Sequence, residues 1–202
     1  MTGVNSALQD LLERTLAKST SHGLLLQVQS SNGRVDFRGS AGDATPEIRF
    51  PIASISKTYT AAMILQLVDE GRLSLDQTGL HVVKGLDHGP NLTIRQLLFQ
   101  TSGLADYYKG GVAEDLIRSR DYAYDLGRVL DWARKGKPQA APDSGKAHYS
   151  DTNFQLLGAV IEAATGLSFG NALQERICAP LGLRRTALFD PDRDAGGQTL
   201  PV

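Results

Sequence analysis

The chain is poor in cysteine, since Cys178 is the only one in 202 residues, and no internal disulfide can form. The four histidines stand well apart at His22, His81, His88 and His148, without the spacing of a metal site. We therefore expect no disulfide framework, no bound metal and no cofactor. The lone Cys178 is predicted to be a small buried hydrophobe.

An excess of charge of one sign is also missing. The 21 Lys and Arg residues against 22 Asp and Glu residues leave a formal net charge of -1, so nothing attracts nucleic acid or an anionic membrane surface. No apolar run approaches the length of a membrane span. Asp10, Glu13 and Arg14 interrupt the segment where a secretory signal would be apolar. We expect no nucleic-acid partner, no membrane and a cytoplasmic location.

The first 53 residues predict a helix followed by a β-hairpin. Residues 6–18 place four leucines on one helical face: Leu8, Leu11, Leu12 and Leu16. Residues 24–28 and 34–38 have the pattern of strands, and Asn32-Gly33 between them is expected to supply the positive φ angles of a tight turn. This region would be the α/β part of an α+β fold.

Helical patterns dominate residues 54–202. We expect helices from near Ser54 to Gly71, after a Thr93 to Gln96 capping box, around 126–132, and over 154–161 with Gly166 at its end. Only residues 48–52 and 186–189 offer further short strands. Because an isolated hairpin is marginally stable, we expect an open strand edge, covered by a second copy of the chain or by a complementing chain.

Ser54 and Lys57 form an S-x-x-K pattern where a loop becomes a helix. The Ser54 hydroxyl and N–H would lie at the positive end of the helix dipole, which stabilises an oxyanion. Lys57, three residues on, shares the same face and could steer the serine proton or act on a nearby phenol such as Tyr149. The alternative is a chance match, because a lone S-x-x-K is common and serine often caps a helix.

Several motifs in order, from about residue 24 to residue 190, closely resemble the serine β-lactamase-related family. This family groups class C β-lactamases, D-Ala-D-Ala carboxypeptidases, D-aminopeptidases and β-lactamase-fold esterases. The motifs that carry the resemblance are Phe50 to Ala61, Glu70 to Asp76, Thr93 to Leu98, Thr101 to Leu104, and Tyr149 to Gly158. The resemblance implies a β-lactamase and penicillin-binding-protein-like transpeptidase fold, present here as a single incomplete domain over residues 1–202.

By the same resemblance, Ser54 is the acylated nucleophile, Lys57 its activating partner and Tyr149 the general base. Tyr107 and Tyr108 fall in a loop that rims the cleft in this family, so they are predicted to contact substrate. Asp151 stands where the family most often has Asn, and it is predicted to be a substrate-binding residue. Its carboxylate is expected to hold Lys57 in the charged form and to disfavour anionic substrates.

Two further departures from the family concern residues around the site. Gln100 stands where many members of the family have His before Thr-Ser-Gly. By the resemblance, we expect a structural role at this position more than a catalytic one. No Lys-Thr-Gly or His-x-Gly follows Tyr149, so we expect the strand that lines the third wall of the cleft to be missing. The chain would then be roughly the N-terminal half of a larger fold.

Two hypotheses follow. The first is a serine hydrolase that acts through an acyl-enzyme on an ester, amide or peptide, weak or inactive as this short chain alone. The second is a non-catalytic truncated or split fragment that needs a partner chain or self-association to complete the fold.

Overall fold

The computed structural model describes residues 2–78, 91–112, 114–115 and 126–188. The chain divides into two compact units, one containing Met1–Pro51 and the other Ile52–Pro191. Three residues named in the sequence-based expectations, His81, His88 and Phe189, lie outside the described ranges. The prediction of one domain divided after residue 53 stays a prediction.

The first unit is a helix on a two-stranded antiparallel sheet. Its elements are α1 (Thr2–Leu16), β1 (Gly23–Gln29) and β2 (Asp36–Gly42). The strands pair along their full length, from Gln29 opposite Asp36 to Gly23 opposite Gly42. The predicted helix and hairpin are confirmed, although α1 begins earlier than residue 6 and β2 continues beyond residue 38.

The turn between the strands differs from the predicted tight Asn32-Gly33 turn. It is a longer loop, closed where Ser30 N–H donates to Val35 O at 2.9 Å. Only Gly33 has a positive φ, at 69°. The Asn32 side chain instead accepts from the Arg34 N–H at 3.1 Å, which is the local hydrogen bond that asparagine offers as an alternative to a left-handed backbone.

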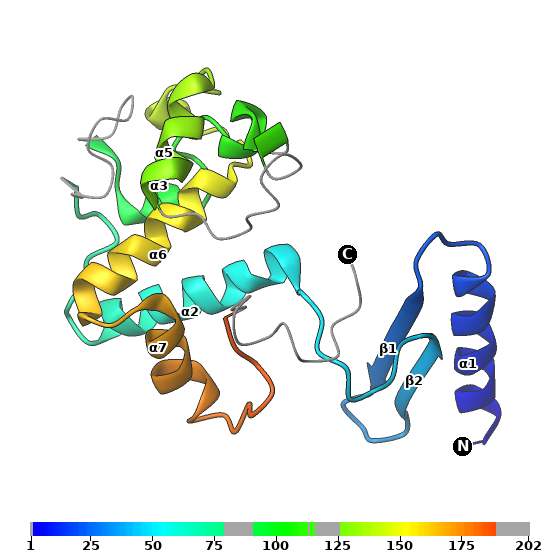
Figure 1. The fold of residues 1–202 in the computed structure, drawn as a ribbon. Coiled ribbons are helices and arrows are strands. Elements are labelled where there is room, and N and C mark those ends of the chain that lie inside the picture. Colours follow the sequence, from blue (N-terminus) through cyan, green and yellow to red (C-terminus); the bar gives the residue numbers. More distant parts are fainter. Residues whose placement is uncertain (1, 79–90, 113, 116–125, 189–202) are drawn as a thin grey trace. The chain divides into compact units, whose positions relative to one another are not determined.

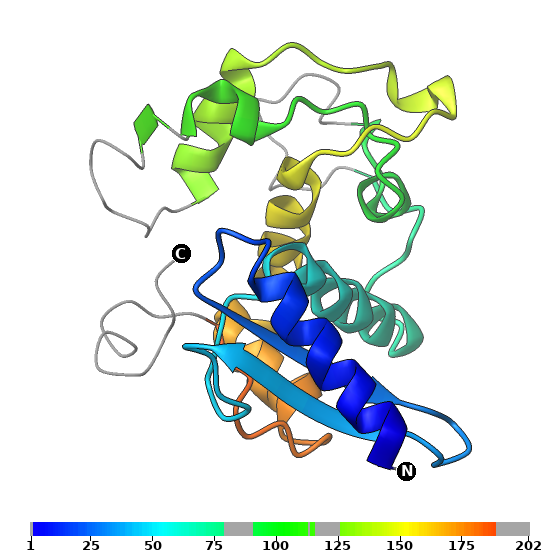
Figure 2. The same ribbon diagram turned by 90° about the vertical axis from the view of Figure 1, so that its right-hand side faces the viewer.

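One face of this sheet is covered by α1, which crosses both strands in Figure 2. Leu12 and Phe37 are buried there, and a side chain on Gly39 would collide with the Phe37 ring and with Gln9. The prediction that Leu11 shares this buried face is wrong, since Leu11 is 49% exposed. A helix turns by about 100° per residue, so the neighbour of a central residue such as Leu12 points away from the sheet.

The second unit is mostly helical. Its longer elements are α2 (Ser56–Asp69), α3 (Ile94–Leu98), α5 (Leu126–Lys135), α6 (Asp151–Thr165) and α7 (Phe169–Leu173). Short turns occupy Ala53–Ile55, Tyr107–Gly110 and Pro142–Ser144, and a π-helical turn occupies Gln174–Cys178. Helix α6 lies in the middle, in contact with α2, α3, α5 and α7 (Figure 1).

The core of the second unit forms around α6. Leu156, Leu157 and Ile161 are fully buried, and Val160 nearly so, because their spacing places all four on one helical face. They belong to one cluster with buried residues of α2, α3 and α5. Cys178 is buried in the same cluster, as predicted.

The helix boundary signals are confirmed. Thr93 Oγ1 accepts from the Gln96 N–H at 3.1 Å, and Gln96 Oε1 accepts from the Thr93 N–H at 3.0 Å, which completes the capping box of α3. Helix α6 ends at Gly166, which takes the left-handed conformation. Of the predicted extra strands, 48–52 contains no more than an isolated bridge at Arg49, and 186–188 contains no strand.

Among the described helices, none is by itself both long and apolar enough to cross a membrane. The bent pair Asp151–Thr165 and Phe169–Cys178, with 80° between its parts, reaches that length and composition together.

Candidate active site

Ser54 lies in the turn Ala53–Ile55 that leads into α2. Its side chain is exposed. Backbone N–H groups in the first turn of a helix have no acceptor inside the helix, so the Ser54 N–H is available to stabilise negative charge. Ala53, directly before it, has a φ of 44°, a conformation that costs energy for a residue with a side chain. The local backbone is therefore held in an unusual shape at the candidate nucleophile.

Lys57 lies one turn further along α2, and its Nζ donates to Ser54 Oγ at 3.0 Å. The same ammonium group forms an ion pair and hydrogen bond with Asp151 Oδ1, from the first turn of α6. It also lies 5.1 Å from the centroid of the Tyr149 ring. Lys57 thus connects Ser54, at the start of α2, with Asp151 and Tyr149, at the start of α6.

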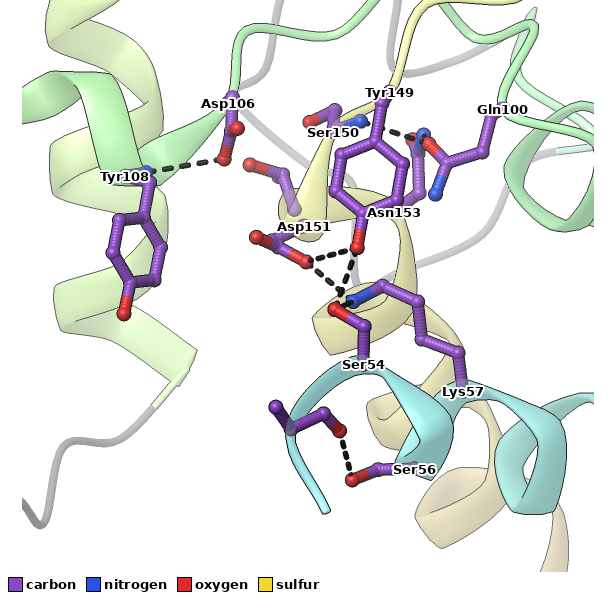
Figure 3. A network of polar contacts seen from close by, with 12 residues as sticks. Ser54, Ser56, Lys57, Gln100, Asp106, Tyr108, Tyr149, Ser150, Asp151 and Asn153 are labelled. Atoms are coloured by element: carbon purple, nitrogen blue, oxygen red, sulfur yellow. Dashed lines mark hydrogen bonds and ion pairs between the residues drawn. The ribbon is translucent and has the colours of Figure 1, made fainter. Parts of the chain in front are cut away.

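Tyr149 lies two residues before the start of α6, and its Oη is 2.8 Å from Ser54 Oγ. The same hydroxyl donates to Asp151 Oδ1 at 3.2 Å. Figure 3 shows the four polar groups of Ser54, Lys57, Tyr149 and Asp151 converging between α2 and the start of α6. The docking of α2 against α6 therefore brings together residues more than ninety positions apart.

The electrostatics of this cluster favour a charged lysine. Burial alone would lower the pKa of Lys57, but hydrogen bonds and charge interactions with Asp151 and Tyr149 outweigh it and raise the pKa above the ordinary value. Asp151, predicted from sequence as a substrate-binding residue, is placed against Lys57 and Tyr149. The serine hydroxyl thus has a cation and a phenol oxygen within hydrogen-bond distance.

The two tyrosines predicted to contact substrate have different surroundings. Tyr107 is 4% exposed and stacks on the buried Trp132 at 6.3 Å between ring centroids, so the structure assigns it to the core and corrects that prediction. Tyr108 is 53% exposed and lies across from Asp151 in Figure 3. Only Tyr108 remains a candidate for contact with a ligand.

A buried polar network that the sequence reasoning missed joins the start of α6 to the segment 102–107. Ser102 Oγ donates to Asn153 Oδ1 at 2.6 Å, and Ser150 Oγ and Thr152 Oγ1 both donate to Ala105 O, at 3.1 and 2.8 Å. Ser102, Ser150, Thr152 and Asn153 have no exposed surface. All four residues lie within motifs that the sequence analysis named. The sequence does not show that their side chains are buried, so the network could not be predicted from it.

The arrangement has the parts of a nucleophilic centre: a hydroxyl, a proton acceptor in contact with it, and a charged group that orients both. Within the described ranges, no group of three His, Cys, Asp or Glu side chains is arranged to hold a metal ion.

Comparison with known proteins identifies the family of the chain. The sequence profile of the family described as beta-lactamase matches residues 8–200. The chain belongs to the β-lactamase family. A D-stereospecific amidohydrolase from Streptomyces sp. superposes with a TM-score of 0.79 at 33% identity, over 89% of this chain and 55% of that one. The fold is therefore of the β-lactamase and penicillin-binding-protein type, as predicted.

Curated members of the β-lactamase family resemble the chain at similar identity. Penicillin-binding protein 4 of Amycolatopsis lactamdurans is 33% identical over 154 residues, which cover 74% of this chain and 38% of that protein. The D-aminopeptidase of Brucella anthropi is 32% identical over 179 residues, or 86% of this chain and 34% of that protein. The chain thus spans between a third and two fifths of the length of these relatives.

Proposed function

We propose that the chain carries the nucleophilic half of a serine hydrolase centre, with Ser54 as nucleophile and Tyr149 as general base. The observation that supports it best is the contact of one hydroxyl, Ser54 Oγ, with both Tyr149 Oη at 2.8 Å and Lys57 Nζ at 3.0 Å. These distances are within the reach required for proton transfer. Membership of the β-lactamase family supports a hydrolase. We infer the roles of Ser54 and Tyr149 from these contacts.

The raised pKa of Lys57 decides which group accepts the proton. An ammonium ion has no free electron pair, so the Tyr149 oxygen, 2.8 Å from Ser54 Oγ, takes the proton from Ser54. Asp151, in turn, keeps Lys57 charged.

The reaction then proceeds in two steps. Ser54 Oγ attacks the carbonyl carbon, the Ser54 N–H stabilises the oxyanion, and Tyr149 passes the serine proton to the leaving amine or alcohol. Water then attacks the acyl carbon and gives a proton to Tyr149, which passes it to Ser54 Oγ as the ester bond breaks and the acid is released. One hard hydrolysis is split into two easier ones.

For the substrate we propose an amide or ester of a D-amino acid or short D-peptide. The similar proteins named above include a D-aminopeptidase and a D-stereospecific amidohydrolase. Asp151 adds a carboxylate next to Ser54, which disfavours a substrate with an anionic group at that side. Because Tyr108 is exposed near this centre, it is available to pack against the substrate side chain.

We expect the activity of this chain alone to be low. No second oxyanion donor is assigned among the described residues, and the loss of one donor costs about 2.7–4 kcal/mol of transition-state stabilisation. A second candidate role therefore remains, a fragment completed by another chain or a second copy. The two-stranded sheet of the described residues, with unpaired strand edges, favours it.

A fluorophosphonate probe tests the proposal without a chosen substrate. We expect slow labelling of wild type, located at Ser54 by peptide mass spectrometry, and none in Ser54→Ala. Ser74→Ala, at an exposed serine that takes no part in the polar cluster, is the matched control and should label like wild type. A folded wild-type chain that takes no label would count against catalysis by this chain. D- and L-alanine anilides then test the substrate class, where equal rates would contradict it.

A further inference from the structure

The end of helix α3 carries an unusual residue for its conformation. Thr101 N–H donates to Gln96 O at 2.9 Å and Gln100 N–H to Leu97 O at 3.3 Å, which is the hydrogen-bond pattern of a Schellman motif. The residue at the left-handed position of this motif is usually glycine, sometimes asparagine. Here it is Gln100, with a φ of 60°. The chain accepts a left-handed conformation for a residue whose side chain disfavours it.

The hydrogen bonds of Gln100 explain why glutamine occupies this position. Gln100 O accepts from the His148 N–H at 2.7 Å, and Gln100 Oε1 accepts from the Ser150 N–H at 2.9 Å. The same Oε1 also accepts from Asn153 Nδ2. Gln100 therefore accepts hydrogen bonds from the backbone N–H groups of His148 and Ser150, the residues on both sides of Tyr149. A glycine would satisfy the end of α3 but would leave the Ser150 N–H without this acceptor.

A third anchor completes the hold on this segment. Gln139 Nε2 donates to Tyr149 O and to Leu104 O, both at 3.2 Å, while Gln139 N–H donates to Gly103 O at 2.8 Å. Gly103 has a φ of 70°, and a side chain on it would meet Ala140 O at 2.0 Å. The segment around residue 139 is thus pressed against the loop that follows Gln100. Two peptide groups of the tyrosine segment are therefore fixed: the group 147–148 through the His148 N–H, and the group 149–150 through both the Tyr149 carbonyl and the Ser150 N–H.

We propose that Gln100 is a positioning residue of the active centre, which fixes the Tyr149 phenol against Ser54 by holding the backbone on both sides of it. Among the described residues, the two non-glycine positions with positive φ are Ala53 and Gln100. One adjoins the nucleophile and the other holds the base, as expected where backbone strain serves a functional site. This inference depends on the function proposed above, but its structural part is measurable separately.

The test compares Gln100→Gly with Gln100→Ala. Both remove the side-chain acceptor, so both should lower the rate of fluorophosphonate labelling at Ser54 by about 10- to 100-fold, the scale expected for a displaced catalytic group. Both variants leave two buried donors without this acceptor, but glycine relieves the left-handed conformation and alanine does not, so the Tm of Gln100→Gly should exceed that of Gln100→Ala. A residue that only ends α3 would give Gln100→Gly an unchanged labelling rate.

Two further variants sharpen the test. Gln100→Glu keeps an oxygen acceptor of the same reach beside the N-terminus of α6, and should restore most of the labelling rate. Thr93→Ala removes the cap at the other end of the same helix and should lower the Tm by about 2–4 °C with an unchanged labelling rate. The midpoint of the pH–rate profile should stay the same in Gln100→Gly, because no ionisable group is altered.

Amide hydrogen exchange separates this inference from the proposed function. The Ser150 N–H should exchange faster in Gln100→Gly than in wild type, while amides in the middle of α2 stay unchanged. If wild type takes no label, the proposed function of this chain fails. The exchange rate of the Ser150 N–H still tests whether Gln100 fixes the backbone beside Tyr149. Equal exchange of Ser150 in the two proteins would overturn the inference, whatever the labelling shows.

Discussion

The two units of the chain differ in how much apolar surface they bury. In the first, the described buried apolar residues are Leu12, Phe37 and Ala44, gathered where α1 covers a two-stranded sheet. In the second, fully buried side chains from α2, α3 and α6 form one continuous cluster. A two-stranded sheet is marginally stable, whereas a multi-helix core supports itself. All four polar residues of the candidate centre belong to the second unit, so its geometry depends on the better packed part.

The largest expected effect comes from a single hydroxyl in the second unit. Tyr149→Phe keeps the ring and removes the proton acceptor, so the labelling rate at Ser54 should fall by about 100- to 10,000-fold. Since Tyr149 is 52% exposed, the Tm should change little. Tyr59→Phe, at a tyrosine packed against the helical core and given no role in the centre, is the control, with a labelling rate close to that of wild type. Equal rates for Tyr149→Phe and wild type would remove Tyr149 as the base.

The next effect compares the two cores directly. Leu157→Ala opens a cavity in the fully buried centre of α6 and should lower the free energy of unfolding by about 2–5 kcal/mol, measured by urea denaturation. Leu12→Ala should increase amide exchange within residues 1–51 and leave both labelling and exchange of α6 unchanged. Loss of labelling in Leu12→Ala would show instead that the first unit supports the centre.

A smaller effect concerns the charge of Lys57. Its raised pKa means that the stabilisation from its ion pair is complete below the ordinary value of 10.5 and is lost as the pH rises through the raised value. Asp151→Asn removes the carboxylate, so the pKa of Lys57 should fall. The alkaline limbs of stability and of the labelling rate should then both begin at lower pH.

The pH–rate profile of labelling checks this expectation, with Asp76→Asn as the control. Asp76 pairs with Arg95 on the surface, so its loss should leave the profile unchanged. An alkaline limb at the same pH in Asp151→Asn and wild type would show that Asp151 does not hold the charge of Lys57.

The smallest effect concerns a surface ion pair between the end of α2 and the π-helical turn. Arg176, through two hydrogen bonds, together with Arg72 holds the pKa of Glu70 below its ordinary value of 4.5. The stabilisation is therefore present above pH 4.5 and is lost as the pH falls through the lowered value. Glu70→Gln should flatten this acid dependence of the Tm slightly. A steeper acid loss in the variant would contradict the pairing.

The parts of the fold that the sequence predicts are those with local signals. The capping box at Thr93 and the helix ends at Gly71 and Gly166 depend on neighbours within a few residues, and the structure confirms them. The hairpin was predicted, but the predicted tight turn at Asn32-Gly33 was wrong, because the Asn32 side chain competes with the backbone for hydrogen bonds. Tyr107 was misplaced because burial depends on Trp132, which is distant in sequence.

For the candidate site, the sequence supplied residue types and the structure supplied contacts. Ser54, Lys57 and Tyr149 were expected together from their motifs, and the structure brings them within hydrogen-bond distance. The two contacts of Gln100 with the Tyr149 segment could not be predicted, because they require a left-handed backbone at a position where no sequence rule expects glutamine. A non-local contact made by a strained residue leaves no local pattern.

The residues of the candidate centre come from two segments that lie far apart in the sequence, and this separation affects when the centre can form. Ser54 and Tyr149 are joined across 95 residues and Lys57 and Asp151 across 94, so these contacts carry a large loop-closure entropy and form late in folding. During synthesis, Ser54 leaves the ribosome several seconds before Tyr149, at about 5–20 residues per second. With the roles proposed for these residues, we expect Ser54 of the nascent chain to take no label until α6 docks on α2. Labelling of Ser54 would then measure the time of that docking step.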